Sequence, residues 1–149
     1  MPRVAQVTAG PGSRVLVADD NRDAAETLAM LLRLDGYEVD VAHSGSDALD
    51  RACGCSYDAI VLDIGMPQGD GYHVARTLRA QPAMRQTMLI ALTGWAQDAD
   101  RRRAFDAGFD EYFTKPVDHD VLLASLRRQR RRNEAPADVS GPGSPVTSG

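Results

Sequence analysis

The segment Val-Leu-Val-Ala-Asp-Asp-Asn at residues 15–21 joins a short apolar run to three polar residues. A helical pattern of apolar residues follows it; Asn21 can cap the start of this pattern, and Gly36 comes just after its end. A buried strand that leads into an amphipathic helix is the repeating unit of an α/β fold. The segment therefore predicts a strand over Val15–Ala18 and a helix from about Asp23 to Asp35.

The same alternation continues along the chain. Further strands are predicted at Val39–Ala42, Ala59–Leu62, Met88–Leu92 and Tyr112–Thr114, and helices near Ser46–Ala52, Tyr72–Ala80, Asp98–Ala107 and Asp118–Arg130. In the helix at 98–107, three arginines leave only Ala99, Ala104 and Phe105 to face a core. Five strand–helix units with apolar strands predict a doubly wound α/β domain, in which helices cover both faces of a parallel sheet.

Length and composition restrict the number of domains and the class of protein. The chain has 149 residues, of which 43% are hydrophobic and 26% charged, so we expect one globular domain. Residues 1–13 and 133–149 are rich in small and polar residues, and we expect them to be flexible, which leaves 14–132 as the domain. No apolar run is long enough to cross a bilayer and no secretion signal is present, so we expect a cytoplasmic protein.

Chemically distinctive side chains stand where the predicted strands end. Asp19 and Asp20 follow the first strand, Asp63 the third, Thr93 the fourth and Lys115 the fifth. Any one of them alone would be taken for a helix cap or an ordinary loop residue. The carboxyl ends of parallel strands share one edge of the sheet, where ligands bind in doubly wound folds. Together, the five residues therefore predict a site at that edge.

The residue types at this edge suggest phosphoryl chemistry. Three clustered carboxylates would repel one another unless a cation lies between them, and Mg²⁺ accepts carboxylates while keeping positions open for a phosphoryl oxygen. Lys115 is the only lysine in a chain with sixteen arginines, and its ammonium can contact one phosphoryl oxygen while Thr93 donates to another. Asp63 is the carboxylate best placed to act as a nucleophile toward phosphorus.

The sequence at this point resembles the receiver domain of two-component response regulators, from residue 14 to about 130. Four motifs carry the resemblance in the family's order: Val-Leu-Val-Ala-Asp-Asp-Asn at 15–21, Ile-Val-Leu-Asp-Ile-Gly-Met-Pro at 60–67, Ala-Leu-Thr-Gly at 91–94 and Tyr-Phe-Thr-Lys-Pro at 112–116. The resemblance implies a flavodoxin-like (βα)5 fold with strand order 2-1-3-4-5.

The resemblance also assigns an acceptor and a metal site. It implies that Asp63 takes a phosphoryl group from a phosphohistidine on a sensor histidine kinase or a histidine phosphotransfer protein. Asp19, Asp20, Asp63 and the backbone carbonyl of Gly65 would hold Mg²⁺. Such a domain catalyses its own phosphorylation and slow dephosphorylation and is no conventional enzyme. The positions that tune phosphate lifetime in the family are here Gly65 and Trp95.

The remaining implied roles concern the response to phosphorylation. Thr93 and Lys115 would contact phosphoryl oxygens, and Tyr112 would change position as Thr93 moves toward the phosphate. The bond between Lys115 and Pro116 would be a cis peptide bond. Helix 98–107, strand 112–114 and helix 118–130 would form the face that contacts a downstream protein or a second copy in a homodimer.

Three alternatives remain open. A phosphatase that hydrolyses its own aspartyl phosphate would need a second carboxylate two residues after Asp63, where Gly65 stands. A degenerate receiver could serve only as a docking module, although the acceptor, metal and lysine positions are all filled. A flavin or dinucleotide site would need a glycine-rich loop after the first strand, where the chain has Asp-Asp-Asn.

The expected partners are proteins. Five arginines lie at 127–132, but cations favour the carboxyl end of a helix and the rest of the domain is acidic, so we expect neither a direct nucleic-acid partner nor a membrane. We expect no output domain in the residues that follow the last predicted helix, because they are few. Two settings suit the chain: a stand-alone regulator, and the receiver of a hybrid histidine kinase. The sequence around residues 70–72 and 108–118 is more similar to receivers of hybrid kinases and favours the second setting.

Overall fold

The computed structural model describes residues 13–65, 71–94 and 98–134. The chain divides into two compact units, residues 1–117 and 118–149. The domain predicted at 14–132 therefore spans parts of both units. The predicted flexible ends at 1–13 and 133–149 lie almost wholly outside the described residues.

The first unit is built on a five-stranded parallel sheet with the order β2-β1-β3-β4-β5. Its strands are β1 (Arg14–Ala18), β2 (Glu38–Ala42), β3 (Ala59–Asp63), β4 (Met88–Thr93) and β5 (Glu111–Thr114). All five predicted strands are present, and the strand order is the one that the family resemblance implies. This confirms the doubly wound fold.

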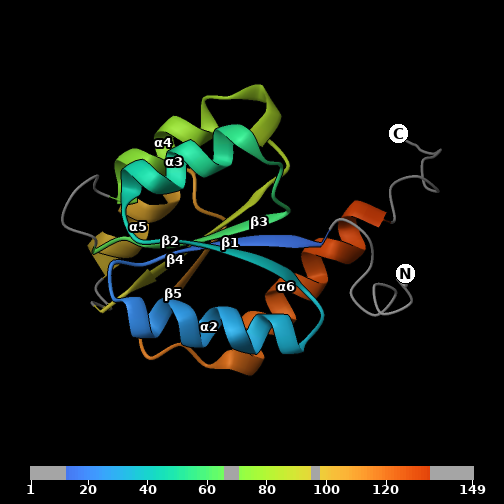
Figure 1. The fold of residues 1–149 in the computed structure, drawn as a ribbon. Coiled ribbons are helices and arrows are strands. Elements are labelled where there is room, and N and C mark those ends of the chain that lie inside the picture. Colours follow the sequence, from blue (N-terminus) through green and yellow to red (C-terminus); the bar gives the residue numbers. More distant parts are fainter. Residues whose placement is uncertain (1–12, 66–70, 95–97, 135–149) are drawn as a thin grey trace, which may run out of the picture. The chain divides into compact units, whose positions relative to one another are not determined.

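Helices cover both faces of the sheet (Figure 1). On one face lies α2 (Arg22–Leu34), and on the other lie α3 (Gly45–Gly54), α4 (Gly71–Arg79) and α5 (Asp98–Ala107). A short 3₁₀ helix that the sequence pattern did not predict, η2 (Pro82–Met84), precedes β4. Helix α2 begins as predicted, because the side chain of Asn21 accepts a hydrogen bond from the Ala24 N–H, and it ends before Gly36, whose φ is +99°.

The core lies on both sides of the sheet because side chains alternate along each strand. Leu16, Ile60, Leu62 and Leu89 are fully buried in the cluster shared with α3, α4 and α5. Alternate strand residues point to the face that α2 covers; they include Val15, Val17, Val61 and Ile90, each at most 1% exposed. Each such side chain contributes about 1.5–3 kcal/mol to folding, and together they hold the strand ends in a fixed register.

One prediction for α5 is wrong. Ala104 is fully buried, but Phe105 is 41% exposed rather than part of the core. The last turn of α5 places Ala107 inward instead, at 3% exposure.

The second unit contains α6 (His119–Glu134), close to the range predicted for the last helix. Asp118 caps it: its carboxylate oxygen Oδ1 accepts hydrogen bonds from the N–H groups of Asp120 and Val121, at 2.9 and 3.3 Å. None of the helices in the described ranges has the length and apolar character that crossing a membrane requires.

Candidate functional site

The residues predicted from the strand ends lie at the carboxyl edge of the sheet. Asp19 directly follows β1, Asp63 is the last residue of β3, Thr93 is the last residue of β4, and Lys115 directly follows β5. The parallel register places these positions side by side because β1, β3, β4 and β5 are consecutive in the sheet. The fold therefore brings all of them to one place.

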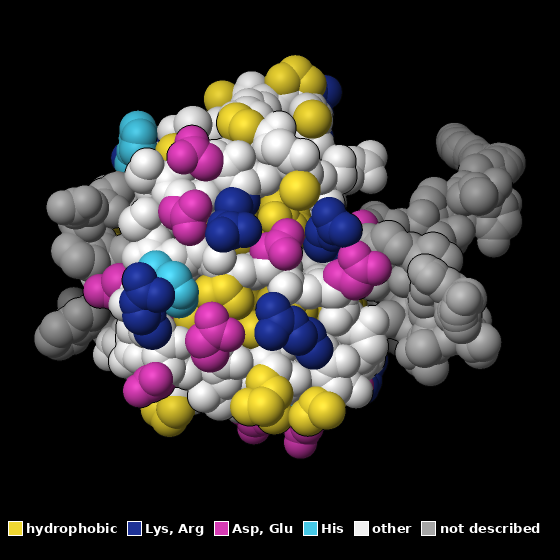
Figure 2. Space-filling view, in the orientation of Figure 1, with side chains coloured by type: hydrophobic (Ala, Val, Ile, Leu, Met, Phe, Trp, Pro, Cys, Tyr) yellow, Lys and Arg dark blue, Asp and Glu magenta, His cyan; other side chains and the backbone are white. Residues whose placement is uncertain are grey.

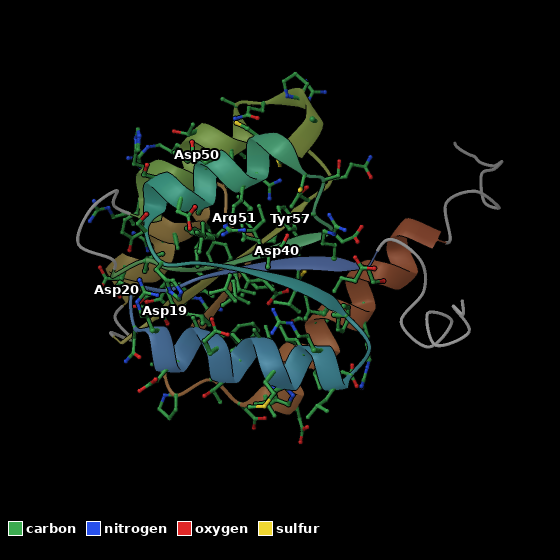
Figure 3. The ribbon with its side chains drawn as sticks, viewed as in Figure 1. Asp19, Asp20, Asp40, Asp50, Arg51 and Tyr57 are labelled. Carbon is green, nitrogen blue, oxygen red and sulfur yellow. The ribbon has the colours of Figure 1, made fainter. Side chains whose placement is uncertain are left out.

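The three carboxylates form a tight cluster. Asp19, Asp20 and Asp63 each offer an oxygen, and these three oxygens lie within 4.8 Å of one another. Asp19 and Asp63 are buried, at 3% and 7% exposure, whereas Asp20 is exposed. Figure 3 shows Asp19 and Asp20 at the end of the sheet from which α2 departs. Such a cluster combines two shielded ligands with one that faces solvent.

Lys115 joins the two buried carboxylates. Its Nζ lies 3.0 Å from Oδ2 of Asp19 and 3.0 Å from Oδ2 of Asp63. Burial alone would lower the pKa of Lys115, but the hydrogen bonds with Asp63 and Asp19 and their negative charges raise it overall. The lysine is therefore a permanent positive charge at the centre of the acidic cluster.

The other oxygens of the buried carboxylates accept backbone hydrogen bonds. Asn21 N–H donates to Oδ1 of Asp19 at 3.0 Å, and Gly65 N–H donates to Oδ1 of Asp63 at 2.9 Å. A Cβ at position 65 would lie only 3.3 Å from Oδ1 of Asp63, so glycine leaves room beside that carboxylate. These bonds fix the orientation of both side chains.

Asp63 is held in an environment that disfavours its charge. Burial raises the pKa of the Asp63 carboxyl above its ordinary value, and the neighbouring Asp19 adds to this effect. The hydrogen bonds from Gly65 and Lys115 act in the opposite direction but do not cancel the increase. A carboxylate with a raised pKa is more basic and keeps its affinity for a positive or electrophilic group.

Thr93 and Tyr112 connect the site to the neighbouring strand. Thr93 is 3% exposed, its carbonyl accepts a hydrogen bond from the Lys115 N–H at 2.7 Å, and its side chain is hydrogen-bonded to Tyr112. Burial raises the pKa of the Tyr112 hydroxyl, as does the charge of Asp100. The peptide bond between Lys115 and Pro116 is cis, the isomer that the resemblance implies.

The donor set of the cluster fits a hard divalent cation. Three carboxylates and one ammonium leave two negative charges unbalanced when all four groups are ionised. All the ligand atoms offered are oxygens, which Mg²⁺ prefers. The charge and chemistry of these residues therefore fit Mg²⁺.

Sequence patterns missed two contacts around this edge. His43 is half-buried, and its Nδ1 lies 3.2 Å from the Asp19 carbonyl oxygen. Gly71 packs so closely on Ile64 that a Cβ would lie 2.6 Å from the Ile64 Cα. Neither has a sequence signal, because both depend on backbone approach. Trp95, the second position expected to affect phosphate lifetime, lies outside the described residues.

Comparison with known proteins gives a consistent result. The model of the response regulator receiver domain matches residues 15–127. Response regulator MprA of Mycobacterium avium (strain 104) is 38% identical over 126 residues, which cover 85% of this chain and 54% of MprA. Transcriptional regulatory protein DltR of Streptococcus agalactiae is 38% identical over 120 residues, 80% of this chain and 53% of DltR. The chain thus spans about half the length of these relatives.

Solved structures resemble the fold along nearly their whole length. The receiver domain of sensor histidine kinase PA1611 from Pseudomonas aeruginosa aligns with a TM-score of 0.73 and 35% identity, over 79% of this chain and 97% of that domain. That structure was described with a magnesium ion coordinated in its active site cleft.

Proposed function

Because the chain belongs to the response regulator receiver domain family, we propose that Asp63 is its phosphoacceptor, and that phosphorylation there switches a protein-interaction surface. The observation that carries the assignment is the placement of Asp63. It is the buried carboxylate that ends the central strand β3, and it contacts the only lysine of the chain and the backbone N–H of Gly65. No other carboxylate of the cluster combines these features.

Receiver domains bind Mg²⁺ in their acidic site, and here Asp19, Asp20, Asp63 and the Gly65 carbonyl oxygen would hold it. A bound Mg²⁺ supplies positive charge to the phosphoryl oxygens. The two unbalanced negative charges of the cluster and the magnesium ion in the PA1611 receiver domain support this ligand set.

The transfer itself follows from the chain's own residues. A carboxylate oxygen of Asp63 attacks the phosphorus of a phosphohistidine, a P–O bond forms, and the P–N bond breaks as the imidazole leaves and takes up a proton. Lys115, already 3.0 Å from Asp63, contacts one oxygen of the arriving group, and the Thr93 hydroxyl donates to another. The protein positions the groups and balances charge, which is most of what phosphoryl transfer requires.

The response to phosphorylation would begin at Thr93. Because its side chain is hydrogen-bonded to Tyr112, a shift of Thr93 toward a phosphoryl group changes the environment of the Tyr112 ring on β5. We expect the surface of α5 and β5 to change as a result and to contact a downstream protein or a second copy of the chain.

Two alternative functions are disfavoured by the residues of the site. A hydrolytic phosphatase is disfavoured because Gly65 offers no carboxylate for acid–base catalysis. A docking-only module is disfavoured because the ion pairs of Lys115 with Asp19 and Asp63 are intact. Either alternative would show no stable phosphoryl adduct.

The phosphoryl donor would be a sensor histidine kinase or a histidine phosphotransfer protein. The similar proteins include whole response regulators and the receiver of a sensor histidine kinase, so both expected settings have relatives. The expectation that no nucleic acid is contacted does not fit the relative described as a transcriptional regulatory protein. About half of that protein lies outside the match, so its activity is not transferred to this chain.

Intact mass after incubation with acetyl phosphate tests the function. We expect one phosphoryl group on the wild type with Mg²⁺, none without Mg²⁺ and none on Asp63→Asn. Asp47→Asn, which changes an exposed carboxylate on α3 outside the cluster, serves as the matched control and should be phosphorylated normally. An adduct of equal yield on Asp63→Asn would refute the proposal.

A further inference from the structure

An arginine of α5 lies on the ring of Tyr112. The Arg101 guanidinium carbon is 5.9 Å from the centroid of the Tyr112 ring and 5.6 Å from that of Phe105. Phe105 is four residues further along the same helix, where side chains at this spacing meet. The guanidinium therefore contacts two rings, one from its own helix and one from β5. Its exposure leaves the charge partly hydrated, and the contact is a cation–π interaction of moderate strength.

The contact with Arg101 explains why the Phe105 side chain is exposed. A large aromatic side chain that is 41% exposed gains little from the core, but the Arg101 guanidinium lies over its ring. Arginine side chains have many rotamers, and ordering one has an entropic cost that a neighbouring ring reduces. Phe105 thus restricts Arg101 to the conformations that lie near Tyr112.

The helix that carries Arg101, α5, is itself fixed to α4. The Arg103 guanidinium carbon lies 4.2 Å from the centroid of the Tyr72 ring on α4, and the Tyr72 hydroxyl lies 3.5 Å from the Asp100 carbonyl oxygen. These contacts hold the first turns of α5 against α4. Arg101 consequently approaches Tyr112 from a fixed backbone.

A continuous set of contacts leads from Arg101 to the carboxylate cluster. Tyr112 is 9% exposed and its hydroxyl is hydrogen-bonded to the side chain of Thr93. The hydrogen bond with Thr93 lowers the pKa of the Tyr112 hydroxyl, so without a ligand the Thr93 hydroxyl donates to the Tyr112 oxygen. A hydroxyl can accept one hydrogen bond while donating another, so when an anion binds, Thr93 can turn to donate to it and accept from the Tyr112 hydroxyl. Bonds in such a chain strengthen one another. The position of the Tyr112 ring therefore affects how well Thr93 binds an anion beside Asp63.

We propose that Arg101 is a positioning residue: its guanidinium, held by Phe105, keeps the Tyr112 ring where its hydroxyl supports Thr93, and so strengthens the binding of a phosphoryl group at Asp63. The inference rests on the proposed function for its last step only. The contact between Arg101 and Tyr112 and its effect on the ring are independent of any ligand.

The first test observes the ring without ligand. The protein is labelled with 3-fluorotyrosine, and the ¹⁹F resonance of Tyr112 is identified as the one missing in Tyr112→Phe. Arg101→Gln should shift this resonance, and Arg101→Lys, which keeps a cation, should return it part of the way. Arg102→Gln is the matched control, because Arg102 is exposed and contacts no aromatic ring in the described part of the chain. An unchanged resonance in Arg101→Gln would refute the contact.

The second test measures coupling to the site with beryllofluoride, a phosphoryl mimic, in the presence of Mg²⁺. Arg101→Gln should bind it about two- to fivefold more weakly, the range expected for an exposed cation–π contact. Arg102→Gln should bind it as the wild type does. In a Tyr112→Phe background the Arg101→Gln change should have no effect, because the ring remains but the hydroxyl that reaches Thr93 is gone.

The outcomes separate the two proposals. If the wild type fails to bind beryllofluoride, the proposed function is wrong, while the fluorine resonance still decides the contact between Arg101 and Tyr112. If the wild type binds and Arg101→Gln binds equally well, or loses as much affinity in the Tyr112→Phe background as in the wild type, Arg101 is not a positioning residue.

Discussion

Two cations of the first unit, Arg79 and Lys115, bind oxygen atoms near opposite ends of the sheet. They differ in whether the charges around them balance. Arg79, at the end of α4, donates to the carbonyl oxygens of Gly108, Met84 and Thr87 at 3.0, 2.8 and 2.9 Å, and to Oδ2 of Asp110 at 2.6 Å. Its five donors meet neutral carbonyls and a single carboxylate, so the charges balance.

Lys115 is placed among too many charges for one ammonium. It contacts Asp19 and Asp63 at 3.0 Å each, and Asp20 adds a third carboxylate to the cluster. The Arg79 network is a closed set of hydrogen bonds that ties α4, η2 and the start of β5 together. The Lys115 cluster leaves two negative charges unbalanced, and this surplus supports the proposal that the cluster binds a cation. Figure 2 shows that acidic and basic side chains are mixed over one exposed face, so charge alone does not mark a site.

The largest expected effect on the free energy of unfolding comes from removing Arg79, whose hydrogen-bond network is balanced in charge. Arg79→Ala should lower the free energy of unfolding by about 2–4 kcal/mol, because three carbonyls and a carboxylate each lose a hydrogen bond from the same guanidinium. Urea unfolding measures the change. Arg76→Ala, on the exposed side of the same helix, is the control and should stay within about 0.5 kcal/mol of the wild type. A similar loss in both variants would show that Arg79 has no special role.

The second largest effect on stability is expected from removing Lys115 from the carboxylate cluster, and this effect depends on pH. Lys115→Met should lower the free energy of unfolding by about 1–3 kcal/mol at pH 7, because two buried carboxylates lose their only ammonium. The loss should shrink as the pH falls through the raised pKa of the Asp63 carboxyl, because a neutral carboxyl no longer needs the ammonium. Added Mg²⁺ should restore part of the stability of the variant at pH 7. A loss independent of both pH and Mg²⁺ would indicate a packing defect instead.

A smaller effect of opposite sign is expected for Asp63→Asn. Burial and Asp19 raise the pKa of the Asp63 carboxyl in the folded protein, so the wild type loses stability as the pH rises through that raised pKa. The variant lacks this loss and should be slightly more stable than the metal-free wild type at pH 7, but not at pH 4. Urea unfolding at the two pH values checks this. A variant less stable at pH 7 would mean that the ion pair with Lys115 outweighs burial.

The smallest effect is expected for an exposed pair. Arg51 Nε lies 3.4 Å from Oδ2 of Asp47 one turn away on α3, with both side chains more than 40% exposed. Arg51→Ala should change the free energy of unfolding by less than about 0.5 kcal/mol, and the change should vanish in high salt. A loss as large as that of Arg79→Ala would break the distinction between balanced, unbalanced and exposed cations.

The two regions also differ in how far the sequence predicts them. The sequence predicts the site residues because each follows an apolar run, and parallel strands bring their carboxyl ends together. These residues are Asp19, Asp63, Thr93 and Lys115. The prediction therefore needs only the order of strands and helices. The partners of Arg79 are mostly backbone carbonyls, which every residue has, and no residue pattern marks them.

The environment of α5 could not be predicted for a related reason. The sequence pattern placed Phe105 in the core because it is one of the few apolar residues of that helix, but the short side chains of Ala104 and Ala107 already fill the inner side. The contact of Arg101 with Tyr112 joins a residue of α5 to a residue of β5. Whether it forms depends on how α5 packs against β5. Such details follow from packing and not from periodicity.

The most direct test of the central claim is to locate the phosphoryl group. After incubation with acetyl phosphate and Mg²⁺, borohydride reduction converts an aspartyl phosphate to homoserine, and peptide mass spectrometry identifies the residue. We expect homoserine at position 63 alone, and only when Mg²⁺ was present. Homoserine at position 19 or 20, or an equal yield at position 63 without Mg²⁺, would contradict the assignment of Asp63 as a metal-dependent phosphoacceptor.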